Sequence, residues 1–66
     1  MNVKYPDIVV QLSGQNGNGF VIVARVMEAL EGARVEQSII EQYQLDALSG
    51  DYGHLLLTTM KWVRVS

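Results

Sequence analysis

The residues that could carry chemistry gather first in a short glycine-rich segment. Gly14, Gly17 and Gly19 stand within the seven residues that begin at Ser13, between a strand pattern and a helix pattern. The unpaired backbone N–H groups of such a loop, together with the helix dipole, favour an anion such as phosphate. The spacing G-x-x-G-x-G matches neither the dinucleotide fingerprint nor the Walker A pattern. The alternative is an ordinary tight connection in which glycine supplies positive φ.

Two candidate ligand-binding side chains that can carry positive charge, Arg25 and His54, stand after this segment. Arg25 follows the last glycine by six residues and could pair with a phosphate, or it could be a solvated helix residue near Glu28. His54 could act as a general acid or contact a ligand. The alternative is a histidine in a capping turn, bonded to Ser49 or Asp51.

Two aromatic residues complete the candidate set. Tyr52 and Trp62 could stack on a base, since every base offers a π-face, or they could belong to the core or a subunit interface. The predicted ligand-binding residues are Ser13, Gly14, Asn16, Gly17, Asn18, Arg25, Tyr52, His54 and Trp62.

The charge and residue usage exclude several function classes. Five basic and seven acidic residues give a net charge of −2, and the basic residues are scattered, so nucleic acid is an improbable partner. One histidine and no cysteine argue against a zinc site and exclude a disulfide. No nucleophile elbow, metal-ligand cluster or tuned acid–base pair stands out, so we expect neither an enzyme nor a cofactor.

The elements that must position these residues follow from the hydrophobic pattern. Alternating residues over 8–12 predict a strand, with Pro6 just before it. Residues 20–32 have helical spacing, with Asn18 as N-cap and Gly32 as C-terminal stop. The alternative for 20–23 is a strand that forms a hairpin with 8–12.

Two further helices and a short strand complete the pattern. Residues 35–48 and 52–62 are predicted to be helices. The first carries one apolar stripe, made of Val35, Ile39, Tyr43 and Ala47, with Ile40 and Leu48 beside it. The second has Asp51 as N-cap and one shared inner face, made of Leu55, Leu56, Thr59, Met60 and Val63. Residues 62–65 alternate and could pair with 8–12. The predicted fold class is α+β, a small single domain of order β-α-α-α-β with a two-stranded sheet packed by helices.

The size of the chain predicts self-association. A core of 66 residues is marginal without a disulfide or a metal, and 48% of the residues are apolar. We therefore expect a homo-oligomer, a dimer or higher. The chain shows no membrane-spanning stretch and no signal-peptide pattern, which predicts a cytoplasmic protein without a membrane partner.

The sequence also carries a wider pattern, made of Lys4–Asp7, Val10–Gly14, Gly17–Asn18, Gly50–Leu56 and Trp62–Val63. It resembles a group of short bacterial and phage proteins, most of them without a named function. Gly19 replaces an alanine of that group and Gly53 an acidic residue, and both changes add flexibility near candidate binding positions.

Two functional hypotheses follow. By analogy with small oligomeric phage proteins that sequester nucleotide signals of host defence, the protein could hold a nucleotide-like or phosphorylated ligand as an accessory, anti-defence protein. Alternatively, it is a protein–protein interaction module that inhibits a host protein through its surplus apolar surface.

Overall fold

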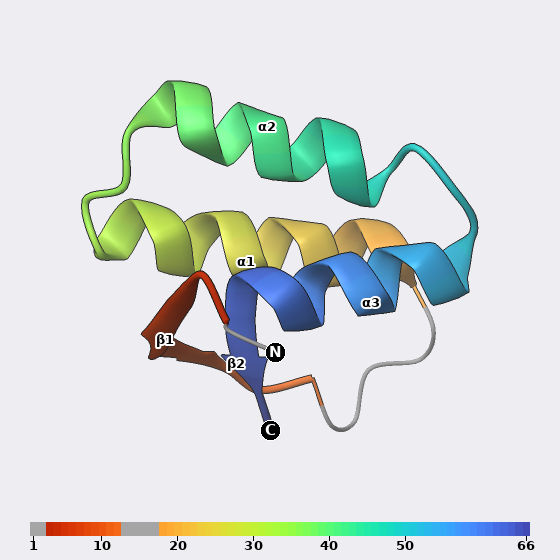
Figure 1. Ribbon diagram of the computed structural model, residues 1–66, viewed down its shortest axis with the longest axis horizontal. Helices are drawn as coiled ribbons and strands as arrows, with labels where there is room; N and C mark the ends of the chain where they lie inside the picture. Colours follow the sequence, from red (N-terminus) through yellow and green to blue (C-terminus); the bar gives the residue numbers. More distant parts are fainter. Residues whose placement is uncertain (1–2, 13–17) are drawn as a thin grey trace.

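The computed structural model describes residues 3–12 and 18–66 of the chain. The element order is β1 (Tyr5–Val10), α1 (Gly19–Gly32), α2 (Gln37–Ala47), α3 (Tyr52–Trp62) and β2 (Val63–Val65). The three helices run antiparallel to one another in turn, and the small sheet lies below the ends of α1 and α3 (Figure 1). This arrangement confirms the predicted β-α-α-α-β fold.

The two strands pair in parallel, which requires a long crossover such as the three helices provide. Val9 is paired with Arg64 and Val10 with Val65, and the Leu12 N–H donates to the Ser66 carbonyl. Pairing of the C-terminal strand with the 8–12 region is therefore confirmed.

The position expected for Pro6 was wrong. Pro6 is the second residue of β1 rather than a residue before the strand. It falls in an irregular stretch between the Tyr5–Val63 and Val9–Arg64 pairs. A proline is tolerated there because no regular ladder bond needs its missing N–H.

Residues 20–23 belong to helix α1, so the hairpin alternative is wrong. The Asn18 side chain caps the helix as predicted, accepting from the backbone N–H groups of Phe20 and Val21. Four apolar residues at helical spacing face the core: Ile22, Val23, Val26 and Leu30. The tertiary burial of this stripe outweighs the β-branched character of the first turn.

The turn after α1 differs in detail from the prediction. The Val35 N–H donates to the Leu30 carbonyl and the Arg34 N–H to the Glu31 carbonyl, as in a Schellman motif. Arg34, and not Gly32, occupies the left-handed position, with φ of 64°. Because this turn uses residues 33–36, α2 begins at Gln37, two residues later than predicted.

The core lies where the three helices meet the sheet. Its buried apolar residues are Val10, Ile22, Val23, Val26, Leu30, Ile40, Tyr43, Ala47, Leu55, Trp62 and Val63. The Tyr43 hydroxyl and Thr59 Oγ1 lie 2.7 Å apart inside it, which satisfies both polar groups. Met60, predicted to share this inner face, is half exposed, because Leu55, Thr58, Thr59 and Trp62 define the buried stripe of α3.

Candidate functional site

Four of the predicted ligand-binding residues cannot be placed. Ser13, Gly14, Asn16 and Gly17 lie outside the described residues. The phosphate-binding geometry predicted for that segment therefore stays a prediction. The remaining five predicted residues are described, and they divide into those near the start of α1 and those far from it.

The start of α1 lies against the start of α3. A Cβ atom built on Gly19 would lie 2.8 Å from Leu55 Cδ1 and 3.8 Å from Tyr52 Cδ1. Asn18 and Tyr52, predicted to act together, are therefore brought to the same end of the molecule. Both helix N-termini open there (Figure 1).

Side-chain caps occupy backbone donors at both of these helix starts. Asn18 Oδ1 accepts from two N–H groups of α1, and Asp51 Oδ1 accepts from the His54 N–H of α3 at 2.8 Å. A helix start attracts an anion through free N–H groups and its positive dipole end. The Asp51 carboxylate already supplies a negative charge at α3, so a phosphate there would meet repulsion.

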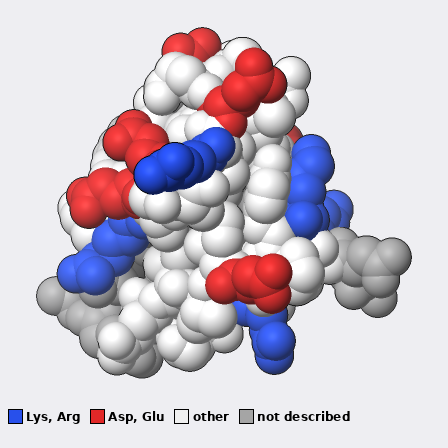
Figure 2. Space-filling model, turned by 90° about the vertical axis from the view of Figure 1, so that its left-hand side faces the viewer, with Lys and Arg blue, Asp and Glu red and all other residues white. Residues whose placement is uncertain are grey.

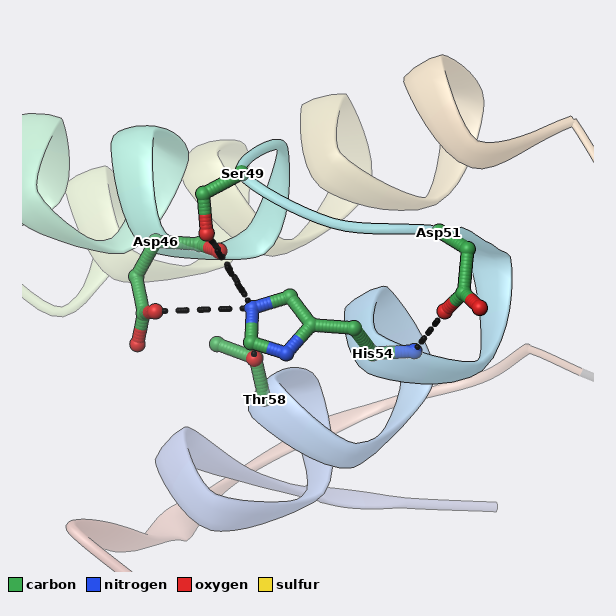
Figure 3. A network of polar contacts seen from close by, with 5 residues as sticks. All are labelled: Asp46, Ser49, Asp51, His54 and Thr58. Atoms are coloured by element: carbon green, nitrogen blue, oxygen red, sulfur yellow. Dashed lines mark hydrogen bonds and ion pairs between the residues drawn. The ribbon is translucent and has the colours of Figure 1, made fainter.

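His54 is held in a local network between α2 and α3 (Figure 3). Its Nε2 lies 2.8 Å from the Asp46 carbonyl oxygen, which can only accept, so Nε2 carries the proton. Ser49 Oγ and Thr58 Oγ1 lie 3.2 and 3.4 Å from the same nitrogen, and Asp46 Oδ1 lies 3.6 Å from it. The His54 side chain therefore stabilises the turn between α2 and α3. This agrees with the alternative interpretation, a histidine in a capping turn that is bonded to Ser49 or Asp51.

Trp62 and Arg25 do not join this end. Trp62 is buried ten residues further along α3, about 15 Å away at the helical rise. Its ring contacts Tyr43 edge-on and stacks on Tyr5, with Lys4 Nζ 4.2 Å from its centroid. Arg25 is exposed on α1 and forms no hydrogen bond or ion pair with a described residue.

The same end of the molecule carries four exposed apolar side chains that the sequence analysis did not single out. We call them the apolar end: Phe20, Val21, Leu45 and Leu48. Phe20 is 74% exposed and Leu45 is 73% exposed. Because α1 and α2 run antiparallel through a short turn, the first turn of α1 lies beside the last turn of α2 (Figure 1). The signal for Leu45 was present, since it falls outside the buried stripe of α2.

The opposite half of the helical layer is charged. The second half of α1, the turn after it and the first half of α2 carry Glu28, Glu31, Arg34, Glu36 and Glu41, all exposed. Figure 2 looks onto that side and shows acidic and basic side chains spread over the surface. The helical layer is therefore charged over one half of its surface, whereas its other half exposes the large side chains of the apolar end.

No family model matches the chain, and comparisons with curated proteins and with solved structures find no match either. Within residues 3–12 and 18–66, no helix is long and apolar enough to cross a membrane. In the same residues, no group of three or more His, Asp or Glu side chains could hold a metal ion.

Proposed function

We propose that this protein is a non-enzymatic protein-binding module that contacts its partner through the apolar end. The observation that carries the proposal is the exposure of Phe20 and Leu45, at about three quarters each, at one end of the helical layer. Full burial of a large apolar side chain is worth about 1.5–3 kcal/mol, so a partner that covers these two side chains would gain binding energy at each of them.

The rim of the apolar end supports a protein partner rather than an apolar small molecule. Arg25 lies one turn after Val21, and Asp46 follows Leu45 in the last turn of α2. An apolar centre with charges of both signs at its edge is the usual composition of a protein interface. The partner is expected to offer a hydrophobic surface with complementary charges, as a host protein inhibited by this module would.

Storage of a nucleotide-like ligand has less support among the described residues. Asn18 and Asp51 occupy backbone donors at the two helix starts. Arg25 lies about 10 Å along α1 from Asn18 at the helical rise. That hypothesis now depends on residues 13–17.

The test compares matched substitutions at the two halves of the helical layer. The double variant Phe20→Gln, Leu45→Gln removes the two most exposed apolar side chains of the apolar end and places a good helix former at both positions. The control, Glu31→Gln with Glu41→Gln, introduces the same residue at two exposed helix positions of the charged half. Tagged wild type and both variants are incubated with bacterial lysate, and the retained proteins are quantified.

The expected result is one stoichiometric protein retained by the wild type and by the control, and reduced at least tenfold with the double variant. Native mass spectrometry of protein purified without denaturation runs in parallel. A phosphorylated small molecule bound to the protein, with equal retention by all three forms, would reject the proposal and favour the sequestering hypothesis.

A further inference from the structure

The outer side of α3 carries a second row of apolar side chains, which begins at Tyr52 beside the start of α1 and continues along α3 away from the apolar end. Tyr52, Leu56 and Met60 follow one another at intervals of four residues, so they form a row along the helix, with Leu57 beside it. Leu57 is 61% exposed and Met60 is 51% exposed, whereas Leu56 is partly buried. We call these four residues the α3 strip. In Figure 1, α3 is the helix nearest the viewer.

We infer that the α3 strip is a homodimer interface in which α3 packs antiparallel on α3 of a second copy. The spacing of the strip is self-complementary. An antiparallel crossing centred on Leu56 places Tyr52 of one copy beside Met60 of the other, twice. Isologous pairing of this kind repeats each contact about the two-fold axis. The Met60 sulfur and the Tyr52 ring also attract each other.

The charges at the two ends of α3 select the same arrangement. Asp51 caps the N-terminus, and Lys61 is the basic residue of the last turn. Neither side chain forms an ion pair with a described residue. The antiparallel crossing brings each Asp51 near Lys61 of the second copy and opposes the two helix dipoles. A parallel crossing would place like charges together.

Gly53 lies on the same outer side of α3. A Cβ atom built there would meet only Asp51 Oδ1, at 3.5 Å, so nothing within this copy requires glycine for space. At an antiparallel helix crossing, however, a missing side chain lets the facing helix approach closely. The second copy therefore gives Gly53 a role that the single chain does not.

The size of the interface sets the expected affinity. A standard interface takes about 800 Å² from each partner, nearly a fifth of the 4429 Å² surface of this chain. An eleven-residue helix is about 16 Å long, so one helix pair covers less than that. We expect a dimer that dissociates on dilution through the micromolar range. It would present two apolar ends, so the molecule would be bivalent for its protein partner.

Single cysteines test the geometry, since the natural chain has none. Two cysteines join only when their Cα atoms lie within about 7 Å. Under mild oxidation, Leu57→Cys is expected to give a covalent dimer, and the control Phe20→Cys is not. A mixture of Tyr52→Cys and Met60→Cys is expected to give mainly mixed dimers of the two variants.

Sedimentation equilibrium of the unmodified chain provides the second measurement. The expected species is twice 7.4 kDa at high concentration. Leu57→Glu should be monomeric, and Lys61→Glu should weaken the dimer several-fold, most strongly at low salt. A wild type that is monomeric throughout, Phe20→Cys dimers forming as fast as Leu57→Cys dimers, or a different protein crosslinked to Leu57→Cys would each overturn the inference.

The experiments can reject the α3 dimer and the proposed protein-binding function independently of each other. A monomeric Leu57→Glu variant keeps the apolar end and should still retain the protein partner in the lysate experiment. A dimer that retains no partner would reject the proposed function and leave the α3 interface standing.

Discussion

Within the part of the chain that the structure describes, the hydrogen bond between Tyr43 and Thr59 is the one polar contact that joins α2 and α3 inside the core. Both side chains are fully buried and their oxygens lie 2.7 Å apart. Periodicity identified Tyr43 as part of the buried stripe of α2 and Thr59 as part of the inner face of α3. The bond itself could not be predicted, because residues sixteen positions apart meet only through the packing of two helices.

The first prediction concerns this bond. Thr59→Val keeps the shape of the side chain but leaves the Tyr43 hydroxyl buried without a partner, which should lower the free energy of unfolding by about 1–3 kcal/mol. Urea unfolding followed by circular dichroism measures this loss. The double variant with Tyr43→Phe should cost less than the sum of the single changes, because both remove the same bond. Additive losses would show that the bond contributes nothing.

The second prediction concerns pH. Burial raises the pKa of Tyr43 above its ordinary value of 10.0, against the smaller opposite effect of the bond to Thr59. The folded protein therefore holds this proton more tightly than the unfolded chain. The contribution is fully present below about pH 10 and is lost as the pH rises from there through the folded-state pKa.

The measurement is the difference in unfolding free energy between wild type and Tyr43→Phe as a function of pH. This difference should be flat from pH 7 to 9 and then move against the wild type above pH 10. A flat difference up to pH 11 would contradict the prediction. The comparison with the variant cancels the titration of the lysines and of the other tyrosines.

At the scale of elements, hydrophobic spacing predicted all three helices, and α3 has the predicted bounds. The caps at Asn18 and Asp51 were predictable because they depend on local side-chain chemistry. The first residue of α2 was not predictable in this way. Its displacement depends on Arg34 adopting a left-handed conformation, which sequence preference assigns to glycine.

The third prediction follows from that turn. An arginine with φ of 64° is strained by its Cβ atom, whereas glycine at this C′ position of the Schellman motif is not. Arg34→Gly should therefore raise the free energy of unfolding by up to about 1 kcal/mol, despite the greater entropy of the unfolded chain. Thermal and urea unfolding measure the change. Glu36→Gly, a nearby exposed position without positive φ, should destabilise, and equal effects of the two changes would refute the explanation.

At the scale of the whole molecule, the large apolar side chains of the described helices are divided between the core, the apolar end and the α3 strip. The size and composition of the chain predicted surplus apolar surface. The place of that surface was not predictable from the sequence, because it depends on which helix ends the fold brings together. The apolar end is formed by residues about 25 positions apart that come to the same end of the helical layer only when α1 and α2 pair.

The last prediction compares an apolar residue of the core with one of the apolar end in the same helix, α2. Ile40 is fully buried and Leu45 is 73% exposed, both in α2. Ile40→Ala should lower the free energy of unfolding by about 2–5 kcal/mol, because it leaves a cavity in the core. Leu45→Ala should change it by no more than about 0.5 kcal/mol, since an exposed side chain loses little and alanine favours the helix. Urea unfolding at low protein concentration measures both. If Leu45→Ala proved as costly as Ile40→Ala, the apolar end would already be covered in the isolated protein, and it could not serve as the free surface that a partner binds.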